Sequence, residues 1–441
     1  MRVAILGGGG FRVPLLHRAL VTSGLDVDEI VLQDVCPARL DVMTAVLRGD
    51  GPAVRTTAEL DAALDGADLV FSAIRVGGLA GRVRDERTAL DLGVLGQETV
   101  GAGGLSYAMR AVPVARHIAM RTADLAPHAW TISMTNPAGV VTEVMAEALG
   151  GRVIGVCDSP IALIRRACAA IGVDPGLSPG TLTERVAVDY LGLNHLGWLR
   201  ALRVDGTDVL PRLLVDSALL QRIEEGRLFG ADLIQALGAL PNEYLYWYYA
   251  AEEALHGVRS AGRTRGEHVL TQQEVFYAAA AVDPANAGAL WAAANDERNR
   301  SYLAELRAGE RDEQDVAAGG YETIAVALAG ALTGAAPATL VLNVRNDTAV
   351  AGLPADAVIE IACRVDRSGA TPLPVGEPTT HQLGLMSLVK SCERAAIEAA
   401  LTGSVQAALR AFALHPLVGS LDAARALARA AMDARGQAQP P

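Results

Sequence analysis

Cysteines are few in this chain of 441 residues, and their number and spacing exclude the frameworks that cysteines usually build. There are five, an odd number, and no two of them form a C-x-x-C pair. A disulfide scaffold or a zinc ribbon needs cysteines paired at short, regular spacings. A reducing, cytoplasmic setting therefore fits best for the five, which are Cys36, Cys157, Cys168, Cys363 and Cys392.

The chain also lacks long apolar runs and an excess of positive charge. Its opening, MRVAILGGGG, has too short an apolar run for a signal peptide, and no stretch approaches the ~20 uninterrupted apolar residues that cross a bilayer. The formal net charge of −12 would repel nucleic acid and anionic membrane surfaces, because both are polyanions. We expect a soluble protein with neither as a partner.

What the chain has is enough apolar sequence for two cores, since 51% of it is hydrophobic and single cores rarely exceed about 250–300 residues. Short apolar runs alternate with helical stretches in the first part, which predicts a doubly wound parallel sheet. The predicted strands are Val3–Leu6, Glu29–Asp34, Leu69–Ile74, Trp130–Met134 and Val153–Val156.

After about Tyr190 the rhythm changes to longer helical stretches, such as 216–227 and 271–280, with an isolated β-rich patch at 340–344 and 357–365. The predicted fold is α/β: an N-terminal Rossmann-like domain, then an α+β domain, arranged as in lactate and malate dehydrogenases. The predicted boundaries are 1–190, 191–432 and a disordered tail at 433–441.

The first motif is the glycine run at 7–10, placed between a strand and a helix, with Asp34 ending the next strand. Glycines let a backbone approach a pyrophosphate at a helix N-terminus, and an acid accepts hydrogen bonds from the adenosine ribose. Asp34 favours NAD over NADP, because a 2′-phosphate would meet a carboxylate. A bare glycine turn also occurs in α/β proteins that bind no nucleotide. The predicted cofactor-binding residues are Gly7, Gly8, Gly9, Phe11 and Asp34.

The stretch from Arg75 to Pro113 is rich in glycine and charge, and it resembles a loop over the cofactor that carries cations for an anionic substrate. Its QETVGAGG run has a backbone that a ligand could approach closely. Composition does not choose among Arg75, Arg82, Arg84 and Arg87, any of which could equally be a solvated surface arginine.

Two segments combine potential metal ligands with hydrogen-bonding groups. VIGVCDSP holds Cys157 and Asp158, and LGLNHLGW holds Asn194 and His195. A thiolate and an imidazole can hold one face of a divalent metal, and ligand chemistry alone would indicate zinc. However, a cysteine that ends a buried strand is more often an apolar filler, and a lone histidine is more often a core residue.

Three further segments carry polar groups suited to a sugar ligand. Asn136 lies in a TNPAG turn, and Arg265 lies just before a helix, where it could hold a phosphate bidentately. PNEYLYWYY at 241–249 contains five aromatic residues. A tyrosine can act as a base, yet packing is the better interpretation for four of the five.

Taken in this order, the segments resemble the family-4 glycoside hydrolases, and within them the 6-phospho-β-glucosidase branch. The resemblance covers nearly the whole chain, and its most specific piece is the run that ends in QETVGAGG. The other matching pieces are TNPAGVVTE, VIGVCDSP, GLNHLGW, PNEYLYWYY, RTRGEHVLTQQEVF, NVRNDTAVAGLPADAVIE and VKSCERAAIEAALTGSVQAAL.

The resemblance implies NAD and a divalent metal, usually manganese, held by Cys157 and His195. It also implies that NAD⁺ accepts a hydride from C3 of the sugar, Tyr244 removes the C2 proton, the aglycone leaves by elimination, water adds, and the ketone is reduced again. The predicted catalytic residues are Tyr244 and Asp158. The predicted substrate-binding residues are Arg82, Asn136, Asn194 and Arg265.

Two departures from the family pattern leave alternatives open. Gly10-Phe11-Arg12 stands where members commonly carry serines, and Asp158 stands where some β-acting relatives have asparagine and α-acting relatives have aspartate. An α-acting enzyme, or one for an unphosphorylated, uronic or sulfonated glycoside, is therefore an alternative. A lactate/malate-type dehydrogenase and a non-catalytic NAD sensor are the others. A homo-oligomer, dimer or tetramer, is expected.

Overall fold

A computed structural model describes residues 1–49, 51–173, 181–301 and 320–436 of the chain. Its N-terminal part is a parallel sheet in which the strands follow the order β3-β2-β1-β4-β5-β6. This is the doubly wound arrangement that the sequence predicted. The strands are β1 (Arg2–Leu6), β2 (Glu29–Gln33), β3 (Ala53–Thr57), β4 (Leu69–Ser72), β5 (Trp130–Ser133) and β6 (Val153–Gly155).

Helices cover both faces of these strands, because side chains alternate between the two faces of a strand. Along β1, Val3 and Ile5 belong to the core under α1, α2 and α7, whereas Ala4 and Leu6 belong to the core under α3, α5 and α6. The helices of this part are α1 (Val13–Thr22), α2 (Pro37–Val46), α3 (Leu60–Leu64), α4 (Gly78–Asp91), α5 (Gly101–Leu125), α6 (Ala138–Leu149), the 3₁₀ turn η1 (Gly150–Arg152) and α7 (Ser159–Ala170).

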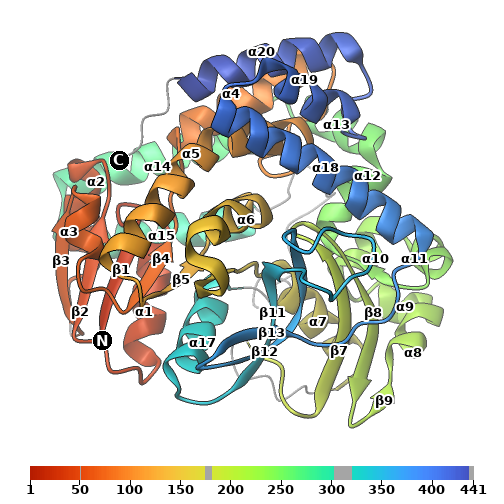
Figure 1. Ribbon diagram of the computed structural model, residues 1–441, viewed down its shortest axis with the longest axis horizontal. Coiled ribbons are helices and arrows are strands. Elements are labelled where there is room, and N and C mark those ends of the chain that lie inside the picture. Colours follow the sequence, from red (N-terminus) through yellow and green to blue (C-terminus); the bar gives the residue numbers. More distant parts are fainter. Residues whose placement is uncertain (50, 174–180, 302–319, 437–441) are drawn as a thin grey trace.

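The sheet continues beyond β6 with antiparallel strands, so all the strands of the described residues form one 13-stranded sheet (Figure 1). The predicted boundary at 190/191 lies inside β7, and the β-rich patch is not isolated, because its two strands join β6 to β7. The added strands are β7 (Val186–Leu193), β8 (Leu196–Val204), β9 (Thr207–Asp208), β10 (Leu240–Pro241), β11 (Ala338–Arg345), β12 (Val358–Asp366) and β13 (Gly369–Pro372).

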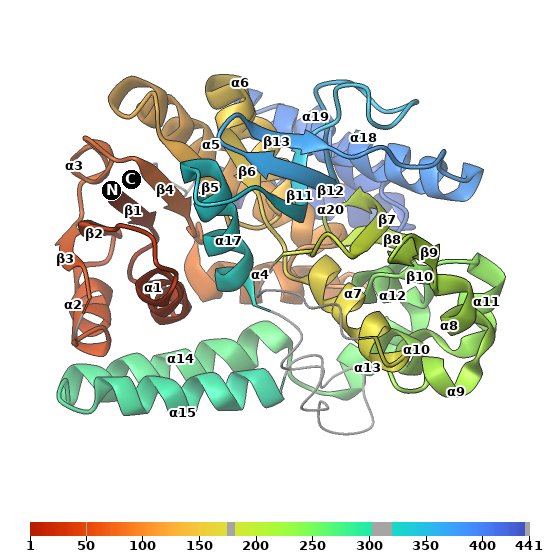
Figure 2. The ribbon, with the colours of Figure 1, turned by 90° about the horizontal axis from the view of Figure 1, so that it is seen from below.

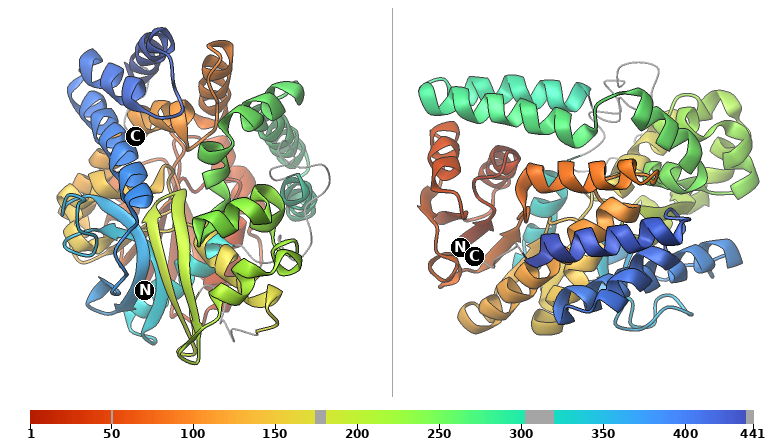
Figure 3. Two further views of the ribbon diagram at one scale, coloured as in Figure 1. Left: turned by 90° about the vertical axis from the view of Figure 1, so that its right-hand side faces the viewer. Right: turned by 90° about the horizontal axis from the view of Figure 1, so that it is seen from above.

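Helices from the second half of the chain pack against the first half on two sides of the molecule. In Figure 2, α14 and α15 run side by side beneath α1 and α2, and the right view of Figure 3 shows α18, α19 and α20 on the opposite side of the molecule. Among the described residues, none of the helices has the length and apolar composition needed to cross a membrane. The helices are α8 (Leu210–Val215), α9 (Ser217–Leu220), α10 (Glu224–Phe229), α11 (Ala231–Leu237), η2 (Glu243–Leu245), α12 (Tyr246–Tyr249), α13 (Ala251–Ser260), α14 (Arg265–Val282), α15 (Ala287–Arg300), α17 (Tyr321–Thr333), α18 (Thr380–Thr402), α19 (Val405–Leu414) and α20 (Leu421–Gly436).

Two predicted element boundaries are wrong. The single helix expected over 216–227 is two short helices, and a Cβ at Gly226 would lie 1.8 Å from the Leu220 carbonyl oxygen, so the chain must turn sharply between them. Residues 433–436 were expected to belong to a disordered tail but are helical, because α20 continues to Gly436 with Ala434 buried. Residues 437–441 of that predicted tail lie outside the described residues.

The loop expected over Arg75–Pro113 is also wrong, because most of this stretch forms α4 and α5. Its glycines permit close packing rather than a flexible loop. A Cβ at Gly103 would lie 1.9 Å from the Gln97 carbonyl oxygen, and one at Gly104 would lie 2.4 Å from the Thr99 carbonyl oxygen. The first turn of α5 is therefore in direct backbone contact with the connection at 92–100.

We predict that Gly103→Ala lowers the free energy of unfolding by about 1–3 kcal/mol or more, because backbone must move to admit the methyl group. Gly384→Ala is the matched control, since Gly384 is also in the first turns of a helix and a Cβ there meets nothing within 4 Å. That variant should leave stability unchanged or raise it by up to about 1 kcal/mol. Chemical denaturation measures both values, and equal effects of the two substitutions would contradict the packing role of Gly103.

Candidate active site

A cavity of about 410 Å³ opens at the carboxyl ends of the parallel strands, where the sheet continues from β1 to β2 on one side and from β4 to β5 on the other. Ligands of open α/β sheets bind at such a switch point. Seven of the predicted site residues line it: Gly7, Phe11, Arg82, Asn136, Asp158, Tyr244 and Arg265. The six that do not line it are Gly8, Gly9, Asp34, Cys157, Asn194 and His195.

The glycine turn after β1 has no room for side chains. Gly7 has a φ of +82°, and a Cβ there would lie 2.6 Å from the Ala73 carbonyl oxygen. Asp34 braces the turn, because its carboxylate accepts hydrogen bonds from the backbone N–H groups of Gly9 and Cys36, each at 3.0 Å. Each carboxylate oxygen can accept one more hydrogen bond. The turn therefore offers backbone to the cavity at Gly7, while the Asp34 carboxylate supports the turn from outside the cavity.

Helices α14 and α15 hold the far side of this turn, which the sequence did not indicate. Trp291 donates a hydrogen bond to the Phe11 carbonyl oxygen at 2.8 Å, and Tyr277 donates one to the Gly9 carbonyl oxygen at 2.7 Å. The Phe11 ring packs against Phe276, with centroids 5.4 Å apart. Phe11 is 5% exposed, so its ring is largely a packing group beside the cavity.

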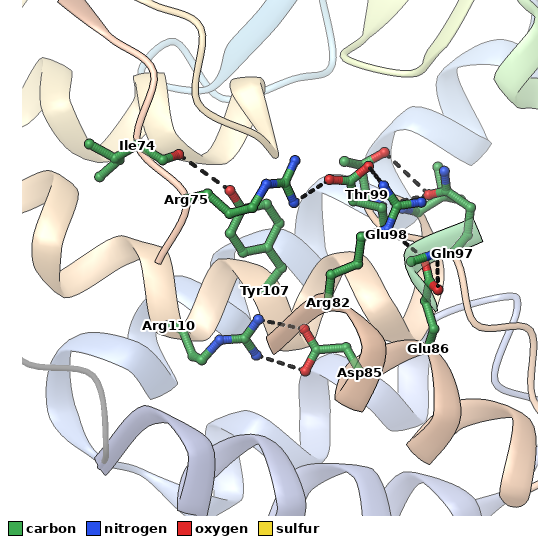
Figure 4. A network of polar contacts seen from close by, with 12 residues as sticks. Ile74, Arg75, Arg82, Asp85, Glu86, Gln97, Glu98, Thr99, Tyr107 and Arg110 are labelled. Carbon is green, nitrogen blue, oxygen red and sulfur yellow. Dashed lines mark hydrogen bonds and ion pairs between the residues drawn. The ribbon is translucent and has the colours of Figure 1, made fainter. Parts of the chain in front are cut away.

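Two of the four candidate arginines after β4 line the cavity, and both are held by carboxylates. Arg75 pairs with Glu98, while Arg82 bonds both Glu98 and Glu86 at 2.7 Å (Figure 4). Burial raises the pKa of Glu98, but the charges of Arg75 and Arg82 outweigh it and lower that pKa to about 2. Arg84 and Arg87 do not line the cavity.

The arginines on α14 and α15 make the adjoining wall cationic. Arg265, at the first position of α14, donates to the Ser301 hydroxyl at 2.8 Å and to the Arg298 carbonyl oxygen at 3.0 Å. Arg298 also lines the cavity, and its buried Nε has no hydrogen-bond partner among the described residues. Burial, together with the charges of Arg12 and Arg265, lowers the pKa of Arg298 to about 9. An anion bound here would relieve this crowding of positive charge.

The sequence analysis missed Arg298, because it lies among the charged residues of an ordinary helix end, NDERNR. Only the fold brings it beside Arg265. Tyr321 was missed as well, because only the fold brings the start of α17 beside Cys157.

Cys157 follows β6 and is 1% exposed. The Tyr321 hydroxyl donates to its sulfur at 3.7 Å. Burial, followed by the charges of Glu360 and Asp158, raises the pKa of the thiol well above its ordinary value. The thiol is therefore neutral at pH 7 unless a bound cation displaces its proton.

His195 occupies the tip of the hairpin between β7 and β8, with a φ of +62° that a bulky residue rarely adopts. Its ring stacks on Tyr244, with centroids 3.7 Å apart and an interplanar angle of 3°. Nδ1 lies 2.7 Å from the Thr99 hydroxyl, and Nε2 is buried with no hydrogen-bond partner among the described residues. Burial lowers the pKa of His195 to about 3, so the ring is neutral at pH 7.

The side chain of Asn194 makes hydrogen bonds that connect the hairpin tip to α6 and β12. Its side chain accepts from the Ala138 backbone N–H at 3.1 Å and donates to Glu360 at 3.2 Å. Glu360 also accepts from Asn343 and Tyr190, each at 3.0 Å. By contrast, the Asn136 side-chain oxygen is buried beside the cavity without a hydrogen-bond partner among the described residues, so it remains available as an acceptor.

Tyr244 is the one residue of the aromatic cluster at 244–249 that lines the described part of the cavity. Its backbone N–H donates to the Asn242 side chain at 3.0 Å, which caps the 3₁₀ turn η2 and fixes the start of the cluster. Trp247 is buried, and Tyr249 accepts a hydrogen bond from Trp198 at 2.9 Å. The remaining aromatic residues therefore pack, as the sequence predicted for four of the five.

At the level of the fold, the chain is similar to a dehydrogenase. Lactate dehydrogenase from Eimeria maxima superposes with a TM-score of 0.52 over 91% of this chain and 95% of that one, at 13% identity. This likeness supports the expected dehydrogenase-like fold. It carries no information about activity.

Whole-chain similarity is much closer to a group of glycosidases. The 6-phospho-β-glucosidase of Escherichia coli (strain K12) is 30% identical over 97% of this chain and 94% of its own length. The structure of the 6-phospho-β-glucosidase from Thermotoga maritima with manganese, NAD⁺ and glucose-6-phosphate covers 100% of both chains, with a TM-score of 0.81 at 26% identity. The model for family 4 glycosyl hydrolases matches residues 2–172, and the model for their C-terminal domain matches residues 190–418. The chain therefore belongs to family 4 of the glycosyl hydrolases.

Proposed function

We propose that this protein hydrolyses 6-phospho-β-glucosides, with NAD and a divalent metal, Mn²⁺, as cofactors. The observation that carries the proposal is that one cavity joins three features: the glycine turn, the cationic wall of Arg265 and Arg298, and Tyr244 stacked on His195. A sugar phosphate needs a cationic end, and the β-acting relatives from E. coli and T. maritima support this substrate class.

The residues present fit NAD. Gly7 lines the cavity next to the N-terminus of α1, and a side chain at Gly7, Gly8 or Gly9 would collide with neighbouring atoms, so the turn offers backbone to a ligand. Phe11 packs on the core side of the turn. Asp34 is positioned to accept from the adenosine ribose and to disfavour a 2′-phosphate. When bound, NAD supplies a hydride acceptor and later returns the hydride.

The residues present also fit a divalent metal, held by the sulfur of Cys157 and Nε2 of His195. A buried imidazole nitrogen without a hydrogen-bond partner is costly unless a ligand satisfies it. Nε2 has no such partner among the residues that the structure describes, which supports this assignment. Two protein ligands would leave other positions on the metal open to substrate oxygens. When bound, a divalent metal would supply stabilisation of the negative charge that develops on sugar oxygens.

The remaining steps, proton transfer and substrate binding, are assigned to residues of the chain itself. Tyr244 removes the proton from C2 and returns one to the sugar, because it lines the cavity and rests on the metal-binding histidine. Arg265 and Arg298 hold the phosphate, while Arg82 and Asn136 bind sugar oxygens. Asp158, at the N-cap of α7 and beside Cys157 in the chain, assists proton transfer at the leaving group. Asn194 orients the hairpin tip beside the substrate.

We also propose that the protein works in the cytoplasm as a homo-oligomer. All five cysteines are free, which supports a reducing compartment. Exposed apolar side chains on α18, α19 and α20 support association of copies: Leu388, Val405, Leu414 and Leu421. Light scattering in solution would reveal a monomer if this proposal is wrong.

The substrate assignment predicts how a chromogenic panel behaves. The nitrophenyl β-glucoside 6-phosphate should be cleaved only when NAD⁺ and Mn²⁺ are present, with NADP⁺ a poor replacement. Arg265→Gln and Arg298→Gln should each raise KM about 10–100-fold, the equivalent of one charge-assisted hydrogen bond. Arg84→Gln, outside the cavity, is the control and should leave KM unchanged. Equal cleavage of the unphosphorylated glucoside, or faster cleavage of the α-anomer, would contradict the proposed substrate.

The role of Tyr244 predicts that Tyr244→Phe lowers turnover by about 10²–10⁴-fold, as expected for removal of a general base. The phenyl ring keeps the stacking on His195, so binding of NAD⁺ and Mn²⁺ should be retained, as calorimetry can measure. Tyr246→Phe is the matched control from the same aromatic cluster. Near-full activity of Tyr244→Phe would show that another group removes the proton.

A further inference from the structure

The connection between α4 and α5 carries a chain of hydrogen bonds that ends at His195. Its first member is Gln97, whose side-chain Oε1 accepts from the backbone N–H of Thr99 at 2.6 Å and of Val100 at 2.8 Å (Figure 4). Two N–H donors converge on this atom, which identifies it as the amide oxygen rather than the nitrogen. Gln97 therefore presents a fixed acceptor.

Thr99 is the second member, and its hydroxyl faces two groups at once. Oγ1 lies 3.2 Å from Oε1 of Gln97 and 2.7 Å from Nδ1 of His195. A hydroxyl has one hydrogen, and Oε1 has none to offer, so the bond between Thr99 and Gln97 requires Thr99 to donate. The hydroxyl can then only accept from Nδ1, which means that Nδ1 carries the ring proton.

The other ring nitrogen of His195 must then hold a lone pair. Nε2 is the nitrogen that is buried without a hydrogen-bond partner among the described residues. The plane of the ring is fixed by its stacking on Tyr244 and by the left-handed backbone of the hairpin tip. The direction of the lone pair is thus set by Thr99 on the α4–α5 connection, by Tyr244 on η2 and by the backbone of the β7–β8 hairpin tip.

We propose that Gln97 and Thr99 are positioning residues that lock His195 in the tautomer with the proton on Nδ1, so that the lone pair of Nε2 is available to a divalent cation. This rests on the metal site of the proposed function. A ligating histidine commonly donates its second N–H to an outer partner, which fixes its tautomer and raises its basicity. Here the outer partner is the Thr99 hydroxyl, which donates its own proton to the amide oxygen of Gln97.

The glycines of this segment keep the chain of hydrogen bonds in place. The Gln97 and Thr99 carbonyl oxygens lie where the Cβ atoms of Gly103 and Gly104 would be, and a Cβ at Gly96 would lie 2.3 Å from the Glu86 carbonyl oxygen. These contacts leave the backbone of the connection no room to shift. The QETVGAGG run thus combines a rigid connection with the two side chains that act on His195.

The test compares Thr99→Val, which removes the hydroxyl at similar size, with Thr99→Ser, which keeps it. In metal-free protein with ¹⁵N-labelled histidine, the His195 signals, identified by their loss in His195→Gln, should report a proton on Nδ1 in the wild type and in Thr99→Ser. Thr99→Val should give a mixture of tautomers. Mn²⁺ affinity, measured from the electron paramagnetic resonance of free Mn²⁺, should fall about 10–100-fold in Thr99→Val and remain close to wild type in Thr99→Ser.

A wild-type His195 protonated on Nε2 would overturn the inference, and so would a folded Thr99→Val that keeps both the tautomer and the Mn²⁺ affinity of the wild type. Gln97→Glu, which retains the acceptor oxygen, should preserve the tautomer, and its loss there would also count against the chain of hydrogen bonds. If the wild type binds no Mn²⁺ while its tautomer is as predicted, the proposed metal site fails and the locking of His195 stands.

Discussion

The pairing of β11 with β6 is the contact on which the rest of the site depends, because it joins the parallel half of the sheet to the antiparallel half. Cys157 follows β6, whereas His195 lies at the tip of the β7–β8 hairpin. In the sheet, β11 and β12 lie between β6 and β7 and so set the separation of the two strands that carry these residues. At this seam Asn343 faces Gly155, where a Cβ would lie 2.3 Å from the Thr142 hydroxyl oxygen, so the residue at 155 must be small.

Buried polar groups next to the β6–β11 pairing connect these strands to the hairpin tip at the site. Glu360 on β12 accepts from Asn343 on the neighbouring strand and from Asn194 on the hairpin tip, and Asn194 also accepts from the first residue of α6. Buried hydrogen bonds of this kind favour one register over others, because a shifted strand would leave a carboxylate without its donors. The hairpin tip that carries His195 is therefore tied to β11, β12 and α6 by one network of hydrogen bonds.

Charge is arranged unevenly around the cavity. Arg75 and Arg82 pair with Glu98 and Glu86, whereas Arg298, on the wall formed by α14 and α15, lies near the positive charges of Arg12 and Arg265, which lower its pKa. A cationic wall facing a metal and NAD site suits a substrate whose phosphate is remote from the reacting carbons. Binding energy from that remote group can then orient C2 and C3 without taking part in the chemistry.

The sequence predicted what local patterns determine: the parallel strands, the glycine turn with Asp34, and packing for most of the aromatic cluster. It could not predict the pairing of β6 with β11, because those strands are far apart in the chain and their apolar patterns fit many partners. The glycines of 101–104 indicated a loop, since composition does not distinguish a glycine needed for flexibility from one needed for close packing. Arg298 went unnoticed, because a surface helix end and a cavity wall have the same composition.

The central claim is that this fold breaks a glycosidic bond through removal of a proton from C2 rather than by direct displacement at C1. Hydrolysis of a 6-phospho-β-glucoside in D₂O, with NAD⁺ and Mn²⁺ present, measures this directly by nuclear magnetic resonance of the product. The account predicts deuterium at C2, since a proton held by Tyr244 exchanges with solvent before water adds to C1. A product that keeps its original hydrogen at C2 throughout the reaction would contradict it.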